Sequence, residues 1–185
     1  GDGNIYVSNI GNTPPSAKDG DGSIAQLSAD GKVLKADWVT GLNAPKGFDF
    51  VGEKMYVTDI DEVVKIDMAS GKIEERYPSI DPQFVNDLSA DRNGDMYFTD
   101  TNSDLVWKMG EGKISTLAKV AGFKPNGILV EKNRILTVSF QGGNFVAIDK
   151  KTGKSEVLAS KIAGGDGIVA HPRGYLVSAW PGEVY

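Results

Sequence analysis

The sequence lacks several residues and patterns on which common sites depend. None of its 185 residues is a cysteine, which excludes a disulfide framework, a thiolate zinc site and a cysteine nucleophile. Histidine occurs once, as His171, which ends an expected strand before Pro172 and so lies away from the candidate site described below. This position argues against a Ser-His-Asp triad. No run of 18 apolar residues exists, so no membrane span is predicted.

Clusters of basic residues are also missing. The chain has 20 Lys and Arg against 25 Asp and Glu, a net charge of −5. This balance argues against nucleic acid as the main partner, and we expect a small-molecule substrate or ligand. The oligomeric state stays open. The first residues match no signal peptide, but a leader could have been removed. The location therefore stays open, and we favour a periplasmic or secreted one over the cytoplasm.

A repeat of about 40 residues is the main feature that the sequence does contain. Four alternating segments share its phase: MYVTD (Met55–Asp59), MYFTD (Met96–Asp100), ILTVS (Ile135–Ser139) and YLVSA (Tyr175–Ala179), which begin 41, 39 and 40 residues apart. A fifth, IYVSN (Ile5–Asn9), lies 50 residues before the first of them, as if one loop had gained about ten residues. Hairpins with glycine-containing turns such as SGK, EGK and TGK follow the segments. Four short strands per repeat, without any sustained helical period, predict an all-β fold of the β-propeller type.

The strand count predicts one β-propeller domain over residues 1–185 that is incomplete. The chain starts in blade 1, after the position of that blade's inner strand, and ends within blade 5 at Gly182–Tyr185. Propeller blades hide their edges by closing a ring. Four to five blades therefore predict a fragment of a longer protein, or else a partner chain that completes the ring.

Four residues stand at the heads of the predicted inner strands: Lys46, Asn86, Asn126 and Asp166, spaced by 40 residues each. Because the four residues occupy the same position in each repeat, we expect them at the same height around the propeller axis. Two amides and a carboxylate are hard oxygen ligands, which suit calcium, magnesium or manganese better than zinc. Asp166 could also act as a general base on a metal-activated water. The alternative is that Asn-Asp, Asn-Gly and Asp-Gly pairs simply form tight turns.

Lys46, Asp59 and Asp100 are further candidates at the same end of the blades. Lys46 could bind an anionic substrate, pair with Asp166, or extend to solvent. Asp59 and Asp100 end their strands and could shape a substrate pocket, but an aspartate in this position often caps a turn.

Three short motifs resemble those of a known family. KPNG (Lys124–Gly127), VND (Val85–Asp87) and DG (Asp166–Gly167) occur in blade order. They are similar to the channel motifs of the gluconolactonase, senescence-marker-protein and luciferin-regenerating-enzyme family. The resemblance implies a six-bladed propeller in the complete protein, with one divalent ion, calcium by preference, in the central channel. It also implies hydrolysis of lactones or related esters.

The resemblance assigns roles residue by residue. Asn126 and Asp166 match two metal ligands, and Asp166 also matches the base; Asn86 matches an asparagine that touches substrate or metal-bound water. The family's third ligand, a glutamate, would lie about four residues before the first residue of this chain. The family usually has an arginine where this chain has Phe84. A polar sugar lactone would lose a hydrogen-bond donor there.

The leading hypothesis is therefore a metal-dependent hydrolase of a lactone or ester. The alternatives are a non-catalytic propeller that binds a small, anionic ligand at the channel mouth, and a protein-interaction scaffold, since the fold alone does not define the function.

Overall fold

The computed structural model describes residues 3–12, 14–79, 81, 83–180 and 182–185. Their strands form five antiparallel sheets. The chain divides into two compact units, Gly1–Pro78 (unit 1) and Ser79–Tyr185 (unit 2). The described residues include no helix, and hence none that could cross a membrane. The predicted all-β class is therefore confirmed.

Unit 1 contains two sheets, each a simple up-and-down arrangement of neighbouring strands. The first consists of β1 (Ile5–Asn9), β2 (Gly22–Leu27) and β3 (Val33–Leu42). The second consists of β4 (Pro45–Val51), β5 (Lys54–Asp59), β6 (Glu62–Asp67) and β7 (Ile73–Pro78). The core between them joins Ile24, Trp38 and Leu42 of the first sheet to Val57 and Ile66 of the second.

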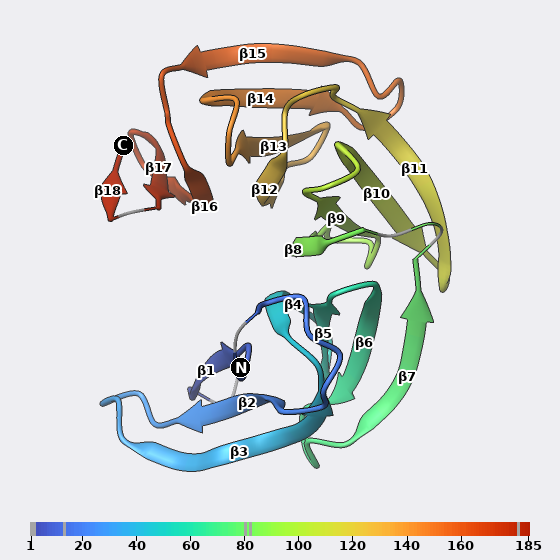
Figure 1. Ribbon diagram of the computed structural model, residues 1–185, viewed down its shortest axis with the longest axis vertical. Helices are drawn as coiled ribbons and strands as arrows, with labels where there is room; N and C mark the ends of the chain where they lie inside the picture. The colour runs from blue at the N-terminus through green and yellow to red at the C-terminus, as the bar shows by residue number, and fades with distance from the viewer. Residues whose placement is uncertain (1–2, 13, 80, 82, 181) are drawn as a thin grey trace. The chain divides into compact units, whose positions relative to one another are not determined.

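Unit 2 contains three sheets with the same strand order. Two have four strands: β8 (Val85–Ala90), β9 (Met96–Asp100), β10 (Leu105–Gly110) and β11 (Lys113–Lys119), then β12 (Pro125–Val130), β13 (Arg134–Ser139), β14 (Asn144–Asp149) and β15 (Ser155–Ser160). The third has β16 (Gly165–His171), β17 (Gly174–Ala179) and β18 (Glu183–Val184). Within this unit β8, β12 and β16 lie along one side, while β11 and β15 lie along the other (Figure 1).

The sheets of unit 2 pack face to face. Tyr97 and Val106 of one sheet meet Ile135 and Ile148 of the next in one buried cluster. A second cluster joins Leu136 and Phe145 to Ile168 and Val177. Alternating strand residues supply both faces of the middle sheet, because successive side chains of a strand point to opposite sides. Burial of these faces is the main favourable contribution to the stability of such a unit.

The predicted repeat matches the observed strands closely. The alternating segments form β1, β5, β9, β13 and β17, and the predicted hairpins form the outer pairs of strands. Strand β3 is the longest strand, with 10 residues from Val33 to Leu42. The predicted single domain over residues 1–185 and the six-bladed ring of the complete protein stay predictions.

The glycine turns between the outer strands have one recurring design. In the segment Asp67–Lys72 the Asp67 carboxylate accepts hydrogen bonds from the Ser70 amide and hydroxyl, at 2.9 and 2.6 Å. Asp149 binds Thr152 in the same way, at 2.8 Å for both bonds. The glycine that follows has a positive φ, 71° at Gly71 and 68° at Gly153. These turns therefore depend on an Asp, a hydroxyl residue and a glycine in fixed order.

Candidate functional site

A β-bulge lies near the start of each inner strand. Between Val85 and Leu88 of β8 the register shifts against β9, and the same shift occurs at the start of β4, β12 and β16. The inner strand advances by three residues where its neighbour advances by two, so the inner strand contains one extra residue. The bulge contains the second residue of every inner strand: Lys46, Asn86, Asn126 and Asp166. Bulges of this kind re-aim side chains at strand ends.

The structure brings Asn126 and Asp166 together. The Asn126 amide nitrogen donates a hydrogen bond to Asp166 Oδ1 over 2.9 Å, although 40 residues separate the two in sequence. Asn126 is buried, with 4% of its surface exposed, whereas Asp166 is exposed. Gly127 allows this close approach, because a Cβ atom there would lie 2.1 Å from the Asp166 carbonyl oxygen. Of the four predicted strand heads, the structure thus brings these two into contact, and their role as metal ligands stays a prediction.

Two threonines hold the backbone around Asn126. Thr99 in β9 donates to the carbonyl oxygen of Asn126, and Thr101 just after β9 donates to that of Pro125, both at 2.7 Å. The Asn86 amide nitrogen in turn donates to the Thr101 hydroxyl at 3.1 Å. Asn86 is thus connected to the Asn126 segment through Thr101.

Asp87 of the VND motif links two sheets rather than facing an open site. Its Oδ2 accepts a hydrogen bond from the Ile128 amide at 2.9 Å, and its own amide donates to the Thr99 hydroxyl at 3.1 Å. A carboxylate that accepts backbone N–H groups is strongly bound and geometrically fixed. Asp87 therefore sets the position of β12 relative to β8.

Asp59 and Asp100 have the same role in their respective units. The two oxygens of Asp100 accept the backbone amides of Gln83 and Phe84, both at 2.9 Å. Those of Asp59 accept the amides of residues 43 and 44, at 2.8 and 2.7 Å. Both aspartates are fully buried. Both aspartates therefore cap turns, as in the second of the two predicted roles, and each carboxylate fixes the loop that leads into the inner strand of its own sheet, β4 or β8.

Lys46 belongs to unit 1, and its ammonium donates to the carbonyl oxygens of Pro15 at 3.0 Å and Ala44 at 2.9 Å. Burial lowers the pKa of Lys46 from its ordinary 10.5 to about 8, although the charge of Asp59 opposes the shift. Phe84 is half-buried before β8, and its carbonyl accepts the Thr101 amide at 3.0 Å. His171 ends β16, on the order of 15 Å along the strand from Asp166.

The donor set around Asp166 supports one kind of metal site better than others. The described residues contain no group of three or more His, Cys, Asp or Glu side chains suited to an ion. Asp166 and the Asn126 amide nevertheless supply a carboxylate and an amide oxygen once the amide turns. One or two carboxylates with retained water are the usual protein ligands of magnesium, whereas calcium takes six to eight oxygens. The residues therefore fit a weakly held, hydrated divalent cation.

The sequence analysis did not predict the residues that position Asn126 and Asp166, which are Asp87, Thr99, Thr101 and Gly127. A signal for Thr99 existed, because threonine precedes the aspartate in both MYVTD and MYFTD. The bulge had a signal too. Val85 and Leu88 are both buried at a spacing of three, which breaks the period of two that a regular strand requires.

A scan of protein-family models gave no match, and a search of curated protein sequences gave none either. Solved structures are similar in fold. A catalytically inactive variant of virginiamycin B lyase from Staphylococcus aureus, with quinupristin, has a TM-score of 0.72 at 16% identity. A streptogramin B lyase has a TM-score of 0.68 at 19% identity, and a chain of the nidogen–laminin complex 0.77 at 18%.

These similarities cover 100%, 98% and 97% of this chain, in the same order. The chain spans 66%, 72% and 68% of the length of those proteins. At such identities the comparison defines the fold, which is that of a β-propeller. The similar structures thus include two lyases and one protein from a protein–protein complex. The resemblance to the gluconolactonase family therefore stays a prediction.

Proposed function

We propose that the Asn126–Asp166 end of unit 2 binds one divalent cation and hydrolyses a lactone or related ester. The observation that carries the proposal is the 2.9 Å contact between these two side chains from neighbouring inner strands. A buried amide and an exposed carboxylate at one strand end form an oxygen-rich site that is open to a ligand. Two lyases among the fold neighbours agree with small-molecule chemistry on this architecture.

Asp166 has two roles in this proposal. A bound cation would polarise the substrate carbonyl and make water more acidic. In the observed conformation Asp166 Oδ1 accepts the Asn126 amide nitrogen, and no described residue of unit 2 donates a hydrogen bond to Oδ2. Once the Asn126 amide turns its oxygen toward a cation, that hydrogen bond would be replaced by contact of Oδ1 with the cation. Oδ2 would accept the proton of the attacking water, which is the role of a general base. Thr99, Thr101 and Asp87 keep the Asn126 segment fixed during that transfer.

The substrate is proposed to be less polar than a sugar lactone. Phe84 offers no side-chain donor at the position where the family resemblance places an arginine. Within unit 2, Asn86 and Asp100 are proposed to shape the site, Asp100 through the loop that it fixes. For Lys46 and Asp59 of unit 1 the roles expected from the sequence, contact with an anionic substrate and support of a pocket loop, stay predictions. Lys46→Met is then expected to weaken turnover of carboxylated esters more than of neutral ones in steady-state kinetics. Equal effects would remove Lys46 from the substrate site.

The test is hydrolysis of a panel of lactones and aryl esters by the full chain, with calcium, magnesium or manganese and then with a chelator. We expect turnover that requires the ion and falls by about a thousandfold or more in Asp166→Asn, because base and ligand are lost together. The matched control is Asp37→Asn, an exposed aspartate on β3 with the same change of charge. Turnover that survives in Asp166→Asn would contradict the proposal. Cation binding without turnover of any ester would favour the non-catalytic alternative.

A further inference from the structure

A hollow lies at the ends of β8 and β12 that are opposite to Asn86 and Asn126. Its volume is about 860 Å³, within the range of small-molecule sites. It is lined by residues 90–93, by residues 130–134 and by Lys150, all within unit 2. Asn86 and Asn126 start β8 and β12, whereas the two lining turns follow the ends of those strands. The hollow is therefore on the order of 13 Å along each strand from the Asn126–Asp166 end.

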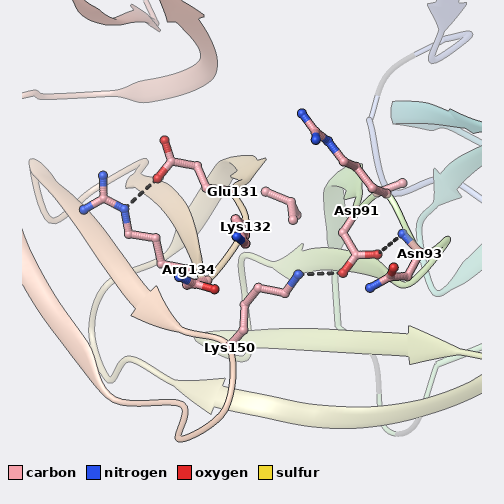
Figure 2. Close-up of a pocket in the computed structure, with 10 residues that line it drawn as sticks. Asp91, Asn93, Glu131, Lys132, Arg134 and Lys150 are labelled. Carbon is pink, nitrogen blue, oxygen red and sulfur yellow. Dashed lines mark hydrogen bonds and ion pairs between the residues drawn. The ribbon is translucent and has the colours of Figure 1, made fainter.

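One of its two carboxylates is neutralised by a buried lysine. Lys150 Nζ donates to Asp91 Oδ2 at 2.5 Å, and both side chains are largely buried, 13% and 10% exposed (Figure 2). Asp91 Oδ1 accepts the Asn93 amide at 2.9 Å. Burial raises the pKa of Asp91, but the Lys150 ammonium and the Asn93 amide outweigh it and keep that pKa below its ordinary value. Lys150 also lies 4.8 Å from the centre of the Tyr97 ring.

The other carboxylate is neutralised in the same manner. Glu131 Oε2 accepts the Arg134 guanidinium at 2.6 Å, and Oε1 accepts the Tyr175 hydroxyl at 2.5 Å. The Tyr175 hydroxyl and then Arg134 lower the pKa of Glu131. Asp91 and Glu131 are therefore ionised at neutral pH and fully engaged by their own neighbours. Neither is available to compensate a further positive charge in the hollow.

Two cations remain without a counter-charge. Arg92 and Lys132 are exposed and form no ion pair or side-chain hydrogen bond with a described residue. In the view of Figure 2, Lys132 is drawn between the Asp91–Lys150 and Glu131–Arg134 pairs. Four cations and two carboxylates give the lining a net charge of +2, in a chain whose net charge is −5. Local positive charge of this kind raises the concentration of anions at the surface.

The turns that carry these two cations are held in place. Asp91 closes the first turn by accepting the Gly94 amide through its carbonyl at 3.0 Å. In the second turn the Glu131 amide donates to the Arg134 carbonyl at 2.9 Å, and the Lys150 amide donates to that of Asn133 at 3.1 Å. Fixed turns lower the entropy cost of placing charged side chains against a ligand. A guanidinium and an ammonium on separate rigid turns suit a group with several anionic oxygens.

We infer that this hollow binds a small phosphate monoester, whose dianionic phosphate lies between Arg92 and Lys132. Two positive charges match the two negative charges of the phosphate at neutral pH. The neighbouring amide side chains of Asn93 and Asn133 provide donors for the rest of a polar ligand. This site is separate from the cation site proposed above, and neither depends on the other.

The test is a titration of the ¹⁵N-labelled full chain with inorganic phosphate at constant ionic strength, followed by amide NMR shifts. We expect saturable shifts at residues 92–94 and 131–134, and binding at least about tenfold weaker in Arg92→Gln/Lys132→Gln. The matched control is Lys113→Gln/Lys119→Gln, which removes the same charge from exposed positions on β11. The control is expected to bind as the unaltered chain does.

Three outcomes would overturn the inference. Shifts that stay linear in phosphate concentration would mean that no site exists. Equal weakening in both double variants would mean that only the overall charge matters. Equally tight binding of succinate would contradict the phosphate assignment, because it would show that two negative charges suffice without a phosphate group.

Discussion

At the scale of single residues, buried carboxylates in this protein hold backbone rather than substrate. Asp100 accepts two consecutive amides ahead of β8, and its Oδ1 also lies 3.2 Å from the Asn102 amide. Asp59 repeats the arrangement in unit 1. From sequence, an aspartate at a strand end can cap a turn or face a pocket equally well. The choice depends on the path of a loop about 16 residues away, which local pattern does not determine.

Removal of Asp100 is expected to destabilise the fold strongly. Asp100→Ala would leave the Gln83 and Phe84 amides without their acceptor, at a cost of about 2–4 kcal/mol. The measurement is the free energy of unfolding from urea denaturation. Glu156→Ala, at an exposed position on β15, is the control and is expected to change it by less than about 0.5 kcal/mol. A change of similar size in both variants would contradict the role assigned to Asp100.

Lys46 is expected to make stability depend on pH in the alkaline range. Burial lowers its pKa to about 8 in the folded chain, against 10.5 ordinarily. Between these values the unfolded chain binds more protons, so the free energy of unfolding increases as pH rises through the window. An uncharged amine can still donate to both carbonyl oxygens, so deprotonation removes no hydrogen bond.

The check is the urea midpoint of the full chain from pH 7.5 to 10.5, compared with that of Lys46→Met. The unaltered chain is expected to gain more stability across this range than the variant. Parallel curves would show that Lys46 titrates normally and is not desolvated as described.

At the scale of elements, the sequence predicted the strands well and their distortions poorly. The SGK and TGK turns were foreseeable because Asp, a hydroxyl residue and glycine recur in fixed order. The bulges at Lys46, Asn86, Asn126 and Asp166 were not predicted, because the 40-residue repeat gives phase but not register. The spacing of three between Val85 and Leu88 indicated an extra residue in β8, and the observed pairing locates one at each head. That bulge determines which side chains meet.

The turn at Gly153 offers a sharp test of packing between neighbouring sheets. Its φ is 68°, and a Cβ there would lie 2.4 Å from the Leu117 carbonyl oxygen on β11. Gly122 has nearly the same φ, 69°, with nothing within 4 Å. Gly122→Ala should therefore cost only the left-handed backbone strain, about 1–2 kcal/mol, and Gly153→Ala at least about 1–3 kcal/mol more. Equal losses in thermal unfolding would mean that the two sheets do not approach closely at Gly153.

At the scale of the whole molecule, the sequence repeat predicts the fold better than it predicts the function. Four repeats in one phase, with a fifth segment offset by about ten residues, were enough to predict a β-propeller, and the solved structures agree. The proposed function depends on side chains that converge from separate repeats, and Asn126 and Asp166 are one such pair in the structure. The repeat predicted that Asn126 and Asp166 lie at the same end of their strands, because both occupy the same position in the 40-residue repeat. It could not predict that Asp87 and Gly127 would control their spacing.

The most direct measurement of the central claim is a manganese titration of the full chain, followed by paramagnetic broadening of assigned amide signals. The account predicts that the amides of residues 126 and 166 broaden first, with a dissociation constant on the order of 10⁻⁴–10⁻³ M, as expected for a site with one carboxylate. Asp166→Asn should abolish that broadening, while Asp37→Asn should leave it unchanged. Broadening that begins elsewhere, or that persists in Asp166→Asn, would contradict the claim that this pair forms a cation site.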